Sequence, residues 1–352
     1  MSRIVSIWNA FWGVGDHAVT VPPMDGALRP NTRLDEARLL AKAKDADNAA
    51  VWEGKLVFSC GADLLFLSTV TDEPKVERSY PAPISAIASD GRKLAVALDD
   101  GTLLVGDKSI ALPLKGGSVS ALAFGRDGAL LIAVGSTTHR ASDWCIDLME
   151  RGKDGAVFRL GPSGRLETLA EGLHHAGGVA ETEDGRVLVS ESWKHRIVAL
   201  TGGTVVPVVW DLPCYPGRIA TDARGFWLCL FAPRSQMVEF VLREPAYRKK
   251  MTETLPQQYW MAPTLRAGKN FREPVQGGGI RHLGVHKPWA PSRSYGLVVL
   301  LDAAGTPIES WHSRSDGHRH GVTSAVTWNG TTVIVCRGDG AIVAIDRDEG
   351  QA

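Results

Sequence analysis

The chain has 352 residues, of which 44% are hydrophobic and 22% charged, a composition with enough apolar surface for a folded core. Lysine plus arginine and aspartate plus glutamate each number 39, so the zero formal net charge favours neither a nucleic acid nor an anionic membrane as a partner. No apolar run approaches the length of a membrane span.

The pattern of residues 1–13 predicts that this segment belongs to the folded protein. Residues 1–13 form a short apolar run that Asn9 interrupts, and no small-residue cleavage pattern follows, so we predict an early strand rather than a signal peptide. The five cysteines are scattered and lack C-x-x-C spacing, which predicts reduced thiols. Both features favour a cytoplasmic location.

From residue 49 onward, one pattern recurs six times: a short strand, a turn that contains glycine, and an alternating apolar strand. The turn glycines are Gly54, Gly91, Gly128, Gly185, Gly225 and Gly330. Repeated four-stranded units of about forty residues are typical of a β-propeller. We therefore predict an all-β fold, a six-bladed propeller that forms a single domain over residues 1–352.

A propeller must close its ring, and the segment 33–40 suggests how. It resembles 165–169, which precedes the fourth repeat and would be the outer strand of the third blade. We expect 33–40 to form the outer strand of the last blade, so that the two ends of the chain pair.

Two insertions interrupt the repeats. The first, 136–153, is charged and contains one tryptophan, and we expect a loop or short helix at one end of the disc. The second, 232–294, interrupts blade five and contains an amphipathic helix from Pro245 to Pro256. This insertion predicts either a lid over the ring or an interface for a homo-oligomer, and the sequence does not separate the two.

Several segments resemble the strictosidine-synthase-like and SMP-30/gluconolactonase superfamily of six-bladed propellers. They are 147–150, 154–159, 191–196, 215–222 and 320–326. The resemblance implies one of two chemistries, calcium-dependent hydrolysis of lactones and esters or metal-free joining of an amine to an aldehyde. Because one fold hosts several reactions, the site must decide between them.

For a lactonase, the resemblance implies a calcium ion on the ring axis, held by side chains at the starts of the inner strands. Here Asp47 and Asn48 are the candidate metal ligands, but Gly177 and Gly217 stand where a further amide and carboxylate are expected. Calcium held partly by carbonyls and water, or no metal at all, both stay open. For a synthase, the resemblance implies a glutamate in the last blade, where this chain has histidines, threonine and serine.

The repeat alignment brings histidines and one arginine from distant segments toward the axis. The candidate catalytic residues are His174, His175, Arg218, His318 and His320. Histidine titrates nearest neutrality and can act as a general base, while Arg218 can either stabilise an oxyanion or pair with Asp47 across the tunnel. The candidate substrate-binding residues are Gly177, Glu191, Gly217, Trp289 and Thr323.

These observations favour a hydrolase of small lactones or esters that uses a histidine as general base, with or without a metal. Two alternatives remain, a condensing enzyme that joins an amine and an aldehyde, and a non-catalytic propeller that binds a ligand or a protein.

Overall fold

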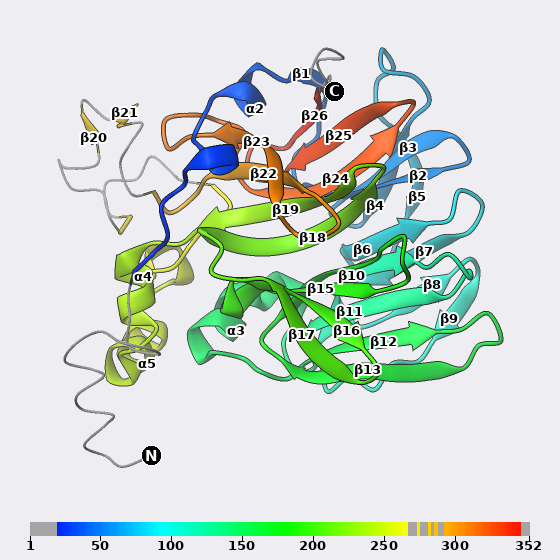
Figure 1. The fold of residues 1–352 in the computed structure, drawn as a ribbon, viewed down its shortest axis with the longest axis horizontal. Coiled ribbons are helices and arrows are strands. Elements are labelled where there is room, and N and C mark those ends of the chain that lie inside the picture. The colour runs from blue at the N-terminus through cyan, green and yellow to red at the C-terminus, as the bar shows by residue number, and fades with distance from the viewer. Residues whose placement is uncertain (1–19, 267–272, 275–280, 283–284, 288–291, 346–352) are drawn as a thin grey trace.

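The computed structural model describes residues 20–266, 273–274, 281–282, 285–287 and 292–345. Within them, six antiparallel four-stranded sheets form a ring, the six-bladed β-propeller that the repeats predict (Figure 1). Each innermost strand lies beside the innermost strand of the next blade, and the last lies beside the first. The starts of these six strands therefore surround one axis.

The first three blades follow the repeat in chain order. Blade one consists of β2 (Ala46–Trp52), β3 (Lys55–Cys60), β4 (Asp63–Leu67) and β5 (Lys75–Ser79). Blade two consists of β6 (Ile84–Ser89), β7 (Leu94–Leu98), β8 (Leu103–Val105) and β9 (Lys108–Ile110). Blade three consists of β10 (Ser118–Phe124), β11 (Leu130–Ser136), β12 (Gly155–Leu160) and β13 (Leu166–Leu173).

The remaining blades complete the ring. Blade four consists of β14 (Ala176–Glu181), β15 (Val187–Glu191), β16 (Arg196–Thr201) and β17 (Thr204–Val209). Blade five consists of β18 (Cys214–Asp222), β19 (Gly225–Pro233), β22 (Gly296–Leu301) and β23 (Pro307–Ser313). Blade six consists of β24 (Val322–Trp328), β25 (Thr331–Cys336), β26 (Ala341–Ile345) and β1 (Arg38–Lys42).

The ring closes where β1 pairs antiparallel with β26, with Arg38 opposite Ala344 and Lys42 opposite Ala341. The predicted closure by the N-terminal segment is confirmed, but the strand begins at Arg38 rather than at residue 33. Residues Arg33–Glu36 form a short helix, α2, instead. Leu34 in this helix is fully buried among residues of blades five and six, and that packing replaces strand pairing there.

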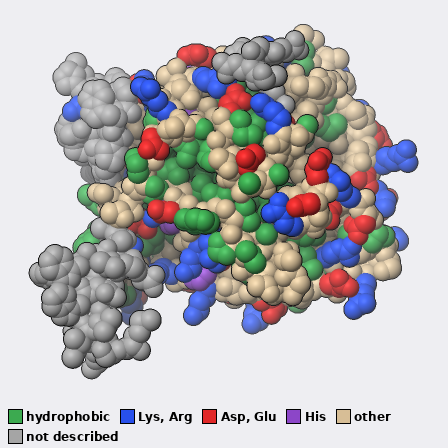
Figure 2. Space-filling model, viewed as in Figure 1, with side chains coloured by type: hydrophobic (Ala, Val, Ile, Leu, Met, Phe, Trp, Pro, Cys, Tyr) green, Lys and Arg blue, Asp and Glu red, His purple; other side chains and the backbone are tan. Residues whose placement is uncertain are grey.

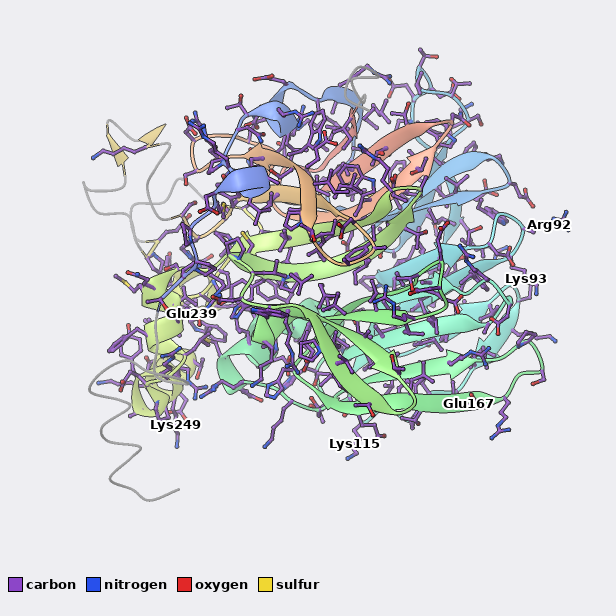
Figure 3. All side chains as sticks on the ribbon, viewed as in Figure 1. Arg92, Lys93, Lys115, Glu167, Glu239 and Lys249 are labelled. Carbon is purple, nitrogen blue, oxygen red and sulfur yellow. The ribbon has the colours of Figure 1, made fainter. Side chains whose placement is uncertain are left out.

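Apolar side chains fill the spaces between neighbouring blades, because alternate residues of each strand face the adjacent sheet. Charged residues lie mainly at the loops and outer strands. Arg92, Lys93, Lys115 and Glu167 project from the edge of the ring (Figure 3). Charges of both signs are interspersed over the face shown in Figure 2.

The short helices outside the blades come mainly from the two insertions. They are η2 (Gly26–Leu28), η3 (Ala141–Asp143), α3 (Trp144–Glu150), η4 (Ser192–Lys194), α4 (Gln236–Val241), α5 (Pro245–Thr254) and η5 (Gln257–Tyr259). A two-residue ladder pairs β20 (Arg281–His282) with β21 (Val285–His286). In the described part of the chain, no helix is long and apolar enough to cross a membrane.

The two insertions meet at one end of the ring (Figure 1). Leu148 of α3, Val238 of α4 and Met251 of α5 belong to one buried apolar cluster. The helix predicted to start at Pro245 is present, and it ends at Thr254, two residues before Pro256. These helices pack against Tyr215 of blade five and against Trp193 in the connection between β15 and β16 of blade four, so the insertions form a cap on this end of the propeller.

Two sequence predictions fall outside the described residues. They concern the early strand at 1–13 and the tryptophan at position 289. The predicted role of 232–294 as a subunit interface stays a prediction.

Candidate functional site

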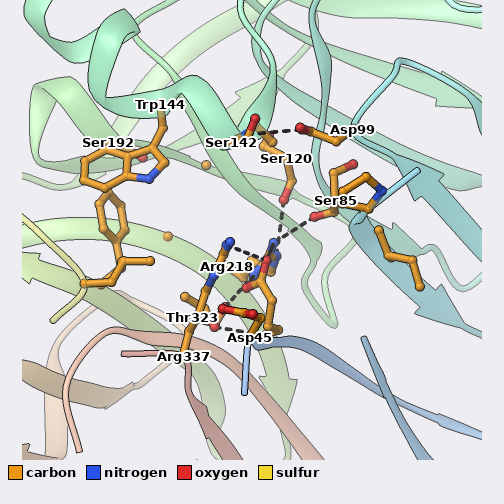
Figure 4. A pocket seen from close by; sticks show the side chains of 18 of the residues that line it. Asp45, Ser85, Asp99, Ser120, Ser142, Trp144, Ser192, Arg218, Thr323 and Arg337 are labelled. Carbon is orange, nitrogen blue, oxygen red and sulfur yellow. Dashed lines mark hydrogen bonds and ion pairs between the residues drawn. The ribbon is translucent and has the colours of Figure 1, made fainter. Parts of the chain in front are cut away.

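A cavity of about 360 Å³ opens at the axis, near the starts of the inner strands. All six blades contribute to its lining, and the cap adds Leu265. Trp144 and Phe231 form one apolar wall, with ring centroids 5.4 Å apart and an edge-to-face arrangement. Asp99 and Ser142 lie on another side, where the Ser142 amide donates to the Asp99 carboxylate over 3.1 Å (Figure 4). The cavity therefore combines an apolar wall with polar groups, as small-molecule sites do.

His175 enters this cavity just before β14. Its Nδ1 lies 2.9 Å from Oδ2 of Asp147 on α3, and that oxygen also accepts a hydrogen bond from Trp193 Nε1 over 2.7 Å. The imidazole stacks on the Trp193 ring with centroids 4.2 Å apart. These contacts orient the imidazole and favour the tautomer with the proton on Nδ1, which leaves the lone pair of Nε2 free. Among the described residues, Nε2 of His175 has no hydrogen-bond partner, and it is not among the side-chain atoms that are fully buried without one.

Two glycines make room for this arrangement. A methyl group on Gly135 would lie 2.4 Å from Cε1 of His175, and one on Gly152 would lie 1.8 Å from Oδ1 of Asp147. His175 itself has a φ of 61°, in the left-handed region that side chains rarely adopt. Backbone strain of this kind concentrates at functional sites.

Arg218 fills the axis (Figure 4). Its guanidinium donates to Asp47 Oδ1 at 2.7 Å and Oδ2 at 3.3 Å. Three backbone carbonyls from different blades accept its other hydrogen bonds, those of Ser85 at 2.9 Å, Thr323 at 3.0 Å and Ser120 at 3.2 Å. A guanidinium has five N–H groups, and all five are used in these contacts.

Asp47 is the buried counter-ion of two arginines. Arg337 donates from Nη1 to Asp47 Oδ2 over 3.0 Å. Burial alone would raise the pKa of Asp47, but the charges of Arg218 and Arg337 outweigh it and lower the pKa to about 2. Asp47 is therefore ionised at neutral pH. Arg337 also lines the cavity with its side chain 37% exposed, and one contact to Asp47 leaves most of its N–H groups available.

The predicted site residues divide into two groups. His175, Arg218, Gly177, Gly217 and Thr323 line the cavity together with Asp47. The remaining predicted residues in the described part lie away from it.

His318 and His320 have partners elsewhere. His318 is exposed and pairs with Asp35 over 3.1 Å. His320 is buried, with Nδ1 2.8 Å from Ser294 Oγ and Nε2 2.8 Å from the Arg314 carbonyl. Because Nε2 faces a carbonyl, it must donate, and Nδ1 then accepts from the hydroxyl. Neither nitrogen of His320 is free to act as a base in this geometry.

His174 and Glu191 belong to a strand connection of blade four. Glu191 is buried, accepts a hydrogen bond from the His174 amide and pairs with Arg196. Asn48 points between blades one and two, where its amide donates to Ser59 Oγ over 3.0 Å. These residues do not line the cavity.

Sequence reasoning did not assign a role to Asp147 or Arg337. Asp147 lies in the first insertion and meets His175 only through tertiary packing, although the segment 147–150 contributes to the family resemblance. Arg337 follows β25 in a turn without any motif. No local spacing could have identified either residue.

The residues at the axis do not fit a calcium ion while Arg218 is in place. Among the groups that accept hydrogen bonds from Arg218, Asp47 supplies the one carboxylate, and two guanidinium groups, those of Arg218 and Arg337, share it. The carbonyls of Ser85, Ser120 and Thr323 already accept N–H donors. Within the described residues, no group of three His, Cys, Asp or Glu side chains is arranged for a metal. Calcium stays an expectation that these contacts do not support.

Comparisons with known proteins support the resemblance at the level of the fold. The family model for strictosidine synthase matches residues 123–200, which include Asp147 and His175. No curated protein matches the sequence.

Three solved structures illustrate how widely the fold is used. A gluconolactonase from Xanthomonas campestris is 17% identical with a TM-score of 0.53, and the match covers 92% of this chain and 96% of that one. Calcium-binding regucalcin from Agrobacterium tumefaciens is 12% identical, with a TM-score of 0.54 and coverage of 88% and 92%. PQQ-bound aldose sugar dehydrogenase from Streptomyces coelicolor is 12% identical, with a TM-score of 0.54 and coverage of 92% and 99%.

Proposed function

We propose that the protein is a hydrolase of small lactones or esters in which His175, held by Asp147, activates water. The observation that carries this proposal is the 2.9 Å contact between His175 Nδ1 and Asp147 Oδ2 at the wall of the cavity. A carboxylate that fixes an imidazole with its second nitrogen free is an arrangement that suits general-base catalysis.

The steps follow from this geometry. Nε2 of His175 takes a proton from water as the water oxygen attacks the substrate carbonyl carbon. The carbonyl oxygen becomes an oxyanion, and the imidazolium is stabilised by Asp147. When the tetrahedral intermediate collapses, the carbon–oxygen bond to the leaving group breaks, and the leaving oxygen takes the proton from Nε2.

We assign oxyanion stabilisation to Arg337 rather than to Arg218. All five N–H groups of Arg218 have protein acceptors, so it has no donor for a substrate. Arg337 is held by Asp47 at one end and borders the cavity with N–H groups to spare. A fixed donor of this kind strengthens its interaction as charge develops on the oxygen.

The structural neighbour named a gluconolactonase supports a lactone as the substrate type, because a ring ester presents the same carbonyl chemistry. The apolar wall of Trp144 and Phe231 suits an alkyl or aryl portion, and Asp99 can accept hydrogen bonds from hydroxyl groups. We expect substrates with both an apolar and a hydroxylated part.

The strictosidine synthase match over 123–200 favours a second candidate, condensation of an amine with an aldehyde. The matched segment contains both Asp147 and His175, and the same base could remove the proton lost from the amine nitrogen as the carbon–nitrogen bond forms. Water is the other product of such a condensation.

A substrate panel separates these proposals. The full-length protein would be assayed on γ- and δ-lactones and aryl esters, and separately on amine and aldehyde pairs, with and without a chelator. Hydrolysis that persists in chelator supports the proposed function. Condensation without hydrolysis favours the second candidate. No turnover in either set contradicts both and favours a binding propeller.

A further inference from the structure

At the ring axis, Arg218 contacts residues from four other blades. Arg218 lies 171 residues from Asp47 in sequence, yet their side chains form a two-point contact at the centre of the ring. The other acceptors come from blades two, three and six. One side chain from blade five therefore contacts four other blades.

The acceptors around Arg218 have the chemistry of a cation site. They are one carboxylate and three backbone carbonyls, the oxygen types that hard cations such as calcium bind. Carbonyl oxygens that converge on one point repel one another unless a positive charge lies between them. The guanidinium supplies that charge.

Ser85 lines the cavity, and its buried hydroxyl has no hydrogen-bond partner among the described residues. Its carbonyl already accepts from Arg218 at 2.9 Å. An axis without the guanidinium would thus offer the carboxylate of Asp47 and the carbonyls of Ser85, Ser120 and Thr323 to a cation.

We propose that Arg218 is a built-in cation that takes the place of a metal ion at the axis of this propeller. It neutralises Asp47, joins the inner strands of five blades and makes divalent metal unnecessary for stability. Removal of the guanidinium should therefore uncover a site for a divalent cation. The proposal concerns stability and metal binding, so it stands or falls separately from hydrolysis.

The test compares the thermal unfolding of four full-length proteins with a chelator and with about 10 mM calcium, roughly tenfold above the Kd of a weak protein site. They are the wild type, Arg218→Ala, Arg218→Gln and Arg218→Lys. Sodium chloride matches the ionic strength in every chelator sample. Calorimetric titration with calcium gives the stoichiometry.

The wild type should show the same Tm in both conditions and bind no calcium at the axis. Arg218→Ala and Arg218→Gln should unfold at lower temperature in chelator and regain several degrees with calcium, because a bound ion stabilises the folded state. Arg218→Lys keeps a positive charge at the axis, so its Tm should not respond to calcium.

Stoichiometric calcium binding by the wild type, with a Tm that falls in chelator, would overturn the proposal. So would the absence of any calcium response in both neutral variants. If Arg218→Ala does not fold, Arg218→Gln keeps more of the side-chain volume and carries the test, and calcium binding by the wild type would by itself overturn the proposal.

Discussion

Asp147 belongs to the insertion of blade three and His175 to the loop that enters blade four, yet Asp147 Oδ2 is 2.9 Å from His175 Nδ1 at the edge of the axial cavity. The insertion between β11 and β12 carries Asp147 on α3, and the loop before β14 carries His175. The contact depends on two glycines, because side chains at Gly135 and Gly152 would overlap the two partners. This dyad is the feature from which the proposed chemistry follows.

Asp147→Asn should lower kcat for hydrolysis by about 10²-fold or more and leave KM nearly unchanged. The asparagine amide cannot stabilise the imidazolium, and it no longer fixes the tautomer of His175. Steady-state kinetics across pH would measure both effects. Glu150→Gln is the matched control, since Glu150 is on the same helix but pairs with His139 outside the cavity. If Glu150→Gln lowered kcat as much as Asp147→Asn does, the loss of activity would come from damage to the helix and not from the missing carboxylate of Asp147.

Gly135→Ala should reduce activity at least about tenfold, because the added methyl would displace the His175 ring. Overpacking of a buried position also costs roughly 1–3 kcal/mol of stability. Gly161→Ala serves as control in the same blade, where a methyl would meet its nearest atom only at 3.7 Å. Kinetics and thermal unfolding of both variants check this prediction. Unchanged activity in Gly135→Ala would contradict the proposed position of the base.

Arg337→Ala should lower kcat/KM about 10²- to 10³-fold, the usual effect of removing one oxyanion donor. Its partly exposed ion pair with Asp47 contributes little to stability, about 1 kcal/mol or less, so Tm should change only slightly. Arg92→Ala, at the edge of the ring, provides the control for loss of a positive charge (Figure 3). If the kcat/KM of Arg337→Ala equalled that of the wild type, the proposed role of Arg337 would be contradicted, and other groups would have to stabilise the oxyanion.

The protein should lose stability as the pH falls below neutrality. Burial lowers the pKa of His312 from 6.5 to about 4, and it also lowers the pKa of His195 and His320. Between pH 6.5 and 4 the unfolded chain binds protons at His312 that the folded chain does not, so the free energy of unfolding decreases across this window.

The pH effect can be assigned by substitution. Urea unfolding at several pH values should show a smaller slope between pH 4 and 6.5 for His312→Gln than for the wild type. The readout is the slope rather than the absolute stability, because glutamine cannot reproduce both the Tyr295 and Ser310 contacts. Equal slopes would show that His312 does not contribute.

The sequence predicted the fold well because its signals are local. The glycine turns and the period-two apolar pattern determine the blades, and the six sheets form where those signals occur. The closing strand begins at Arg38 and not at residue 33, because Leu34 is buried in a short helix, a packing that strand periodicity does not predict. The helix that starts at Pro245 was predictable because proline favours the first position of a helix and Pro256 marks its end.

The site was only partly predictable because its side chains have partners from segments that are distant in the sequence and meet only in the folded chain. His175 and Arg218, two of the residues predicted to lie near the axis, line the cavity, and Arg218 pairs with Asp47, which was one of the alternatives. The partners of His320 and the position of Asp147 depend on residues in other elements and on rotamers that no repeat pattern specifies.

The most direct test of the account is the hydrolysis rate of His175→Gln on the best lactone or ester substrate, in the presence of chelator. We expect kcat to fall about 10²- to 10⁴-fold relative to the wild type, with Tm nearly unchanged, because glutamine fills the space but cannot take the proton from water. Hydrolysis at the wild-type rate by a folded His175→Gln protein would contradict the proposed role of the dyad.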